Sequence, residues 1–163
     1  MLRLGIASAL VLAVVGGAVV LVRPGLREGR LADAGREVFS SVGRAILAGI
    51  LPLDAGATQI ALNGMLDRID ALTLALPPHV QAELSQLLGL LATSAGRIAL
   101  AGLATSWPKA SVPQVQEALQ SMRASDLALR QQAYAALHDI VSAAYFSDAG
   151  TWSVLGYPGP TPV

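Results

Sequence analysis

Candidate catalytic side chains are few in this chain of 163 residues. Asp67 and Asp70 stand three residues apart in a stretch expected to be helical, so both carboxylates share one face. Paired carboxylates can perform acid–base chemistry or bind a metal. Arg68 lies beside them and no second cluster follows, which favours a solvated charged face. An enzyme that recruits this pair and His138 into a cleft is the weaker hypothesis.

The two histidines also have ordinary structural explanations. His79 follows two prolines at an expected helix start, and we predict a solvated residue at the edge of a loop. His138 is predicted to lie on a helix surface or partly buried, with Tyr134 one turn earlier on the same face. We expect Asp139 not to face it, because adjacent helical residues point apart. A ligand or proton-shuttle role for His138 is the alternative.

Motifs and composition exclude several classes of function. The chain has no GxGxxG, Walker, GxSxG or HExxH motif. It has no cysteine, and therefore no disulfide framework, iron–sulfur cluster or thiolate zinc site. Eleven basic and eleven acidic residues give a net charge of zero, which offers nucleic acid no electrostatic footprint. We predict no catalytic residue, no metal ligand, no cofactor site and no nucleic-acid partner.

The chain is short of charge for a lone soluble domain. Hydrophobic residues make up 53% of it and charged residues 13%, against about 25% in typical globular domains. So few charged residues provide too little polar surface to cover a lone soluble domain. The composition therefore indicates contact with a membrane, with a partner protein, or with both.

An uncharged apolar run occupies the N-terminus, from residue 4 to residue 22. Its nineteen residues are long enough to cross the ~30 Å hydrocarbon layer as a helix. A cleaved signal peptide or a buried core helix are the alternatives, but the bulky residues that end the run argue against cleavage. We predict that residues 1–24 form a transmembrane anchor, in which the membrane-embedded residues include Leu4, Leu10, Val14, Val20 and Val22.

Helical periodicity continues through residues 25–146, and no stretch shows sustained alternation of period two. We therefore predict an all-α fold, a bundle of five or six helices behind the anchor. Ser111 and Gln114 have the spacing of a capping box, and Ser125 or Asp126 is expected to cap the last helix. The expected helices are 31–50, 58–76, 79–91, 94–103, 111–123 and a last one ending at residue 146.

The end of the chain, residues 147–163, differs from the bundle. Four of the seven aromatic residues lie between residue 145 and residue 157. The prolines after Tyr157 cannot continue a helix, so we predict an extended tail that packs on its own helices or on a partner. Trp152 and Tyr157 are typical interface anchors, whereas Trp107 is either a plug between helices or such an anchor.

Part of the chain, residues 100–160, resembles the small subunit of bacterial membrane-bound flavin dehydrogenases, the family of the gluconate 2-dehydrogenase third subunit. The ending Trp-x-x-Leu-Gly-Tyr-Pro-Gly-Pro, at residues 152–160, is the more specific part of this resemblance. The other matching residues are Trp107, 111–119, 129–139, 143–146, Asp148 and Thr151.

The resemblance implies a non-catalytic subunit that supports the folding, export or stability of a larger dehydrogenase of the glucose–methanol–choline class. The FAD is then bound by that partner, and a cytochrome c or a quinone accepts its electrons. Many relatives begin with a twin-arginine leader, but here Arg3 stands alone. This suggests that the partner carries its own export signal or that the chain meets its partner after translocation. The partner-binding residues expected on this basis are Trp107, Tyr134, Tyr145, Trp152, Leu155, Tyr157, Pro158 and Pro160.

The resemblance also implies a single-pass protein of the bacterial inner membrane with a periplasmic domain. Four arginines between residues 23 and 36 follow the apolar run and only Arg3 precedes it, a count that favours the cytoplasm. The margin is small, and we favour the periplasmic side. The alternative function is a stand-alone membrane-anchored helical binder of lipids or other apolar ligands.

Overall fold

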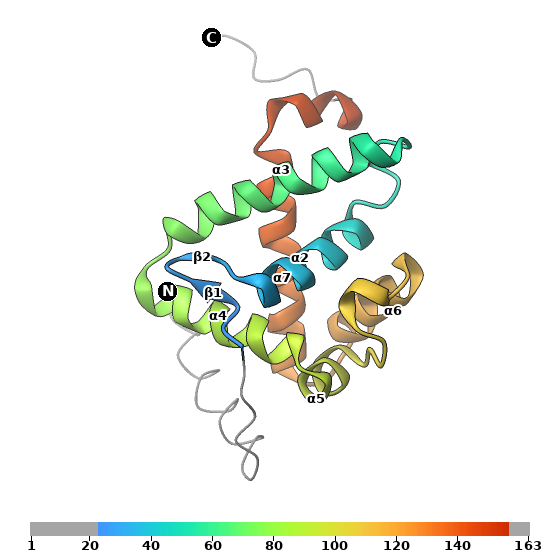
Figure 1. Ribbon diagram of the computed structural model, residues 1–163. Coiled ribbons are helices and arrows are strands. Elements are labelled where there is room, and N and C mark those ends of the chain that lie inside the picture. The colour runs from blue at the N-terminus through green and yellow to red at the C-terminus, as the bar shows by residue number, and fades with distance from the viewer. Residues whose placement is uncertain (1–22, 157–163) are drawn as a thin grey trace.

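The computed structural model describes residues 23–156, and this part of the chain is mostly helical. The predicted all-α fold is thus confirmed for these residues (Figure 1). The α-helices are α2 (Asp33–Ile46), α3 (Ala55–Leu74), α4 (Pro78–Ala92), α5 (Ser94–Gly96), α6 (Val112–Arg123) and α7 (Ala128–Phe146). The shorter elements are strands β1 (Leu26–Arg27) and β2 (Arg30–Leu31), the π-helix η1 (Arg97–Ala101), and the 3₁₀-helices η2 (Trp107–Lys109) and η3 (Ala149–Leu155).

Several predicted residues lie outside the described range. These are the anchor residues Leu4, Leu10, Val14, Val20 and Val22, and the tail residues Tyr157, Pro158 and Pro160. Within residues 23–156 no single helix has the length and hydropathy needed to cross a membrane. The bent pair formed by α4 and the segment 94–101 passes that test jointly, by length and composition, with a 90° angle between its halves.

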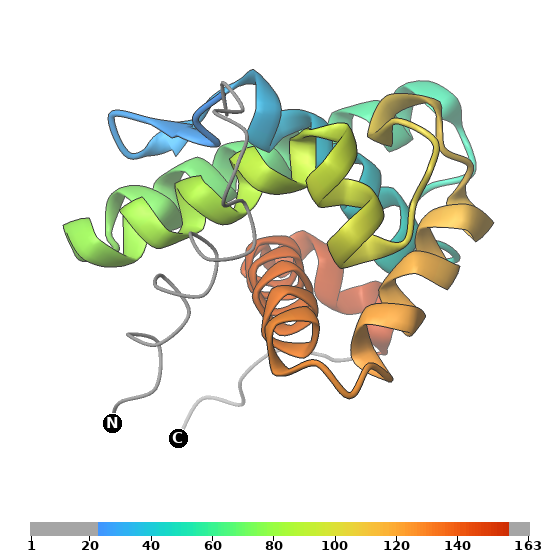
Figure 2. The same ribbon diagram turned by 90° about the horizontal axis from the view of Figure 1, so that it is seen from below.

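Helix α2 lies at the centre of the bundle and packs against α3, α4, α6 and α7 (Figures 1 and 2). Its apolar stripe is fully buried, because Val38, Phe39 and Val42 have no exposed surface. The neighbouring helices also bury apolar residues at helical spacing. Their fully buried members include Met65, Ile69, Leu137 and Val141.

A β-hairpin, which the sequence pattern does not predict, precedes α2. Strands of two residues are too short to show alternation. Glu28 and Gly29 connect them with positive φ angles of 52° and 77°, as in a type I′ turn. The paired Leu26 and Leu31 are buried on the core side, whereas the arginines beside the turn are exposed.

The short helix expected over residues 94–103 is present as α5 and η1, over residues 94–101, and a sharp bend of 90° separates it from α4. Thr93 ends α4, and its hydroxyl accepts a hydrogen bond from the Gly96 N–H at 3.0 Å. The three-residue α5 then widens into η1, which ends at Gly102 in the left-handed conformation, φ 68°. The glycine is permissive there, since a side chain would strain this backbone.

The capping predictions are half right. Ser111 and Gln114 form the predicted capping box, with side-chain to backbone bonds in both directions. The last helix ends at Phe146 as expected, but its N-cap is Leu127, not Ser125 or Asp126. Ser125 accepts the Leu127 N–H through its hydroxyl at 3.2 Å, so it stabilises the turn before the helix.

The prediction that the tail is extended from residue 147 onward is wrong for its first part, which forms η3. This stretch contains no proline, so nothing prevents a helical turn. Asp148 starts the turn, because its carboxylate accepts the Gly150 N–H and its carbonyl the Thr151 N–H, both at 2.9 Å.

Candidate functional site

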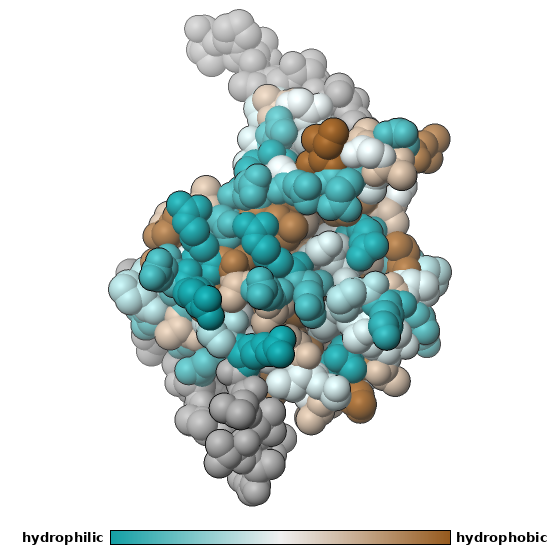
Figure 3. Space-filling view, in the orientation of Figure 1, coloured by the Kyte–Doolittle hydropathy of each residue, from teal (hydrophilic) through white to brown (hydrophobic). Residues whose placement is uncertain are grey.

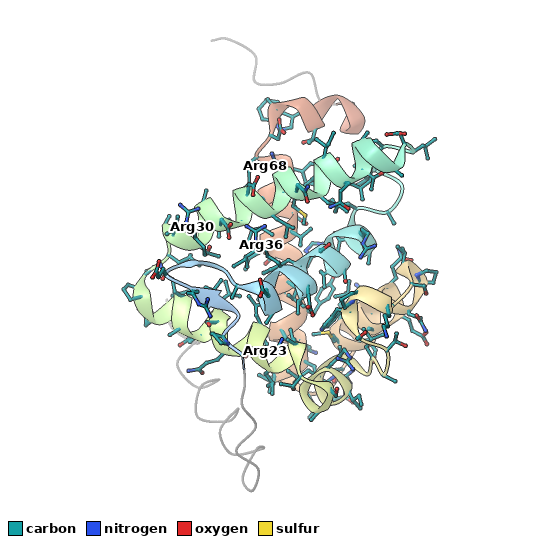
Figure 4. The ribbon with its side chains drawn as sticks, in the orientation of Figure 1. Arg23, Arg30, Arg36 and Arg68 are labelled. Atoms are coloured by element: carbon teal, nitrogen blue, oxygen red, sulfur yellow. The ribbon has the colours of Figure 1, made fainter. Side chains whose placement is uncertain are left out.

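The two carboxylates predicted to share one face of a helix, Asp67 and Asp70, lie in different environments. Asp67 has a side chain that is 75% exposed and lies 4.0 Å from the Arg36 guanidinium, as expected of a solvated face. Asp70 is buried, and the prediction of a solvated group is wrong for it. Its carboxylate accepts the Leu31 N–H at 2.7 Å and a hydrogen bond from Arg36. Asp70 thus ties the hairpin and α2 to α3, and its position gives it a structural role. Its partner Arg36 is labelled in Figure 4.

The histidines lie where local interactions explain them. His79 is exposed, as predicted. His138 stacks on Tyr134 with ring centroids 5.5 Å apart, also as predicted. Its Nδ1 lies 3.1 Å from the Asp139 carboxylate, so the expectation that these neighbours do not meet is wrong. Both side chains are on the surface, where they have room to bend toward each other.

These groups do not converge into a site within the described part of the chain. No hydrogen bond or ion pair there joins His138 to Asp67 or Asp70. Residues 23–156 also contain no group of three or more His, Asp or Glu side chains placed to hold a metal ion. Within residues 23–156 no contact among these three side chains supports the enzyme hypothesis.

Trp107 is a plug between helices, so its prediction as a partner contact is wrong. The side chain is 1% exposed, and its Nε1–H donates to the Leu91 carbonyl at 2.7 Å. Its own carbonyl accepts the Ser41 hydroxyl at 2.8 Å, which links η2 to α2. Tyr145 is likewise buried and packs edge-on against Phe146, so it too lies inside the domain rather than on a contact surface. Tyr134 is half-buried.

The start of the tail is attached to the bundle by polar bonds. The Arg68 guanidinium on α3 donates to the Ala144 carbonyl at 2.6 Å and to the Asp148 carboxylate at 3.2 Å. Trp152 is half-buried, and its Nε1–H donates to the Phe146 carbonyl at 2.8 Å. The side chain of Leu155 lies outside the described part of the structure. Helix α3 and the end of α7 therefore hold the start of the tail against the domain.

Two large apolar side chains are exposed near the start of α3, and sequence reasoning missed them. Leu53 is fully exposed and Ile60 is 75% exposed. Asp54 caps α3 by accepting the Ala57 N–H at 2.7 Å, which leaves Leu53 just outside the helix. In Figure 3 hydrophobic side chains are visible at separate places on the end of the molecule that carries η3 and the start of α3, with hydrophilic side chains between them. These two side chains are the candidate contact residues on this end of the domain.

A cleft of ≈ 270 Å³ lies between the hairpin side of α2 and the end of α4. Arg23, labelled in Figure 4, and Glu37 line it together with small residues. Its charged walls are unlike the apolar cavity that the lipid-binder alternative needs. The other lining residues are Ala34, Gly89, Ala92, Thr93 and Ser94.

No protein-family model matches this chain, and neither does any curated protein or solved structure.

Proposed function

We propose that this chain is a non-catalytic, membrane-anchored helical subunit that binds and stabilises a larger FAD-dependent dehydrogenase of the alcohol- or sugar-oxidising type. The pair would lie at the bacterial inner membrane, with the helical domain in the periplasm and a cytochrome c or quinone as electron acceptor. The substrate chemistry and the FAD belong to the partner.

The observation that carries this proposal is the exposed apolar surface of Leu53 and Ile60 near the start of α3, at the end of the molecule that carries η3 (Figure 1). Burying one such side chain in an interface contributes about 1.5–3 kcal/mol. The tail adds Trp152, a residue type enriched among interface hot spots. The bonds from Arg68 hold the start of the tail in place beforehand, which lowers the entropic cost of docking.

The first test is purification of the tagged full chain from its native membranes in mild detergent. A stoichiometric large partner with flavin absorbance near ~450 nm is the expected result. A colourless protein that purifies alone and carries bound lipid would contradict the proposal and favour the lipid-binder alternative.

A matched pair of variants tests the surface itself. Ile60→Asp places a charge in the proposed interface and should weaken partner binding roughly tenfold or more, since it removes about 1.5–3 kcal/mol of apolar burial. Leu127→Asp makes the same kind of change at a residue that is 63% exposed at the other end of α7. Co-purification measured side by side should fall for Ile60→Asp alone. Equal losses in both variants would show that α3 is not the contact surface.

A further inference from the structure

The bend after α4, which we define as residues 93–104, presents an uncharged surface to solvent. Its one charged residue is Arg97, which is 6% exposed. That guanidinium donates to the carbonyls of Leu103 at 3.0 Å and Ala104 at 3.2 Å, so it points into the bend and not toward solvent. Ile98 is the large apolar side chain on the outside, 53% exposed. The other exposed residues are small: Ser94, Ala95, Ala99, Gly102 and Ala104.

This bend lies beside the point where the N-terminal apolar run joins the domain. Arg23 is the residue directly after the run of residues 4–22. It lines the same cleft as Thr93 and Ser94. Figure 1 shows the first described residues and α5 at the same end of the molecule, opposite η3.

We infer that the bend docks into the interfacial layer of the lipid bilayer, with Ile98 as the inserted side chain. This inference rests on the membrane anchor of the proposed function. A domain joined without a linker to a bilayer-spanning segment must hold its attachment end at the membrane surface. An uncharged, apolar surface gains free energy in that layer, whereas exposed charge on it would oppose entry into the layer. The burial of Arg97 leaves the bend's own residues without such a charge. The cation packed against the bend is the half-buried Arg130 of α7, whose guanidinium is turned inward to donate to the Leu100 carbonyl at 2.7 Å. Arg23 and Glu37, the charged residues of the adjacent cleft, stay at the level of the lipid headgroups.

The absence of cysteine from the chain makes this contact measurable. Ile98→Cys in the full chain gives a single site for the environment-sensitive dye NBD. Ile60→Cys is the control, because it labels an equally apolar and more exposed position at the other end of the domain. The probe is a vesicle of phosphatidylethanolamine and phosphatidylglycerol that contains a doxyl-labelled lipid. An interfacial side chain lies about 5–10 Å below the surface, so doxyl should quench roughly half of the emission at position 98 and little at position 60.

The vesicles are also washed at alkaline pH to separate two kinds of failure. A chain that stays in the membrane while position 98 is quenched no more than position 60 overturns the docking and leaves the anchor standing. A chain that the wash removes overturns both the anchor and the docking. Retention together with selective quenching at position 98 establishes the contact.

Discussion

Two corners of this domain bury a charged side chain, and they do so in opposite ways. At the hairpin, Asp70 accepts hydrogen bonds from the Leu31 N–H and from Arg36, whose side chain is 40% exposed. At the bend after α4, Arg97 donates to two backbone carbonyls, and no ion pair to it is present among residues 23–156. In both corners irregular backbone leaves polar groups that need hydrogen-bond partners. A carboxylate accepts a backbone N–H at the hairpin, whereas a guanidinium donates to backbone carbonyls at the bend.

The difference affects the surface of each corner. The hairpin corner keeps exposed charges, including Arg27 and Arg30 opposite one another across the two strands. The bend hides its charge inside and exposes Ile98 with small residues. One corner is therefore suited to water and the other to an apolar environment, which is the basis of the membrane contact inferred above.

The largest stability effect is expected for Arg97→Met, which fills similar space but leaves the Leu103 and Ala104 carbonyls unpaired. We expect the free energy of unfolding to fall by about 2–4 kcal/mol, measured by urea unfolding of the full chain in detergent with far-UV circular dichroism. Arg123→Met is the control, because that arginine is exposed and bonded only to the Gln120 side chain among the described residues. If Arg97→Met lowered the free energy of unfolding as little as Arg123→Met, water would be the hydrogen-bond partner of the two carbonyls in the variant.

A smaller loss is expected for Asp70→Asn, about 1–3 kcal/mol in the same unfolding measurement. The amide keeps one acceptor for the Leu31 N–H or for Arg36, and the partly exposed Arg36 can turn to water. Asp67→Asn, on the same face, should change stability by no more than about 0.5 kcal/mol because its side chain is exposed. If Asp70→Asn cost more than Arg97→Met, the charged pair would dominate and our ranking of the two corners would be wrong.

The smallest effect is a gain. Glu28 holds a positive φ in the hairpin turn, a conformation that asparagine tolerates better. Glu28→Asn should raise the free energy of unfolding by about 0.5–1 kcal/mol, seen as a higher urea midpoint. The same substitution at the exposed, helical Glu117 should lower stability, since asparagine is the poorer helix former. A loss at both positions would show that the Glu28 side chain has a role that the turn geometry does not reveal.

Local chemistry made much of the fold predictable. The period of Val38, Val42, Leu137 and Val141 predicts which helix faces are buried, because a helix repeats every 3.6 residues regardless of its neighbours. The capping box at Ser111 is also local, since its two partners are three residues apart. The hairpin was not predicted because strands of two residues show no period. The helix η3 was not predicted because the prolines after Tyr157 suggested an extended conformation for the whole tail, although residues 147–156 contain no proline.

The sequence by itself therefore determined the helical class, the buried stripes, the capping box and the low charge of this chain. The tertiary structure alone decided that Trp107 is a plug, that Asp70 is buried while Asp67 is solvated, and that Arg97 faces inward. These outcomes depend on contacts between distant segments, such as Leu31 with Asp70 and Leu91 with Trp107. Periodicity places a residue on a face of its own helix, but only the packing of other elements decides whether that face meets carbonyls, carboxylates or water.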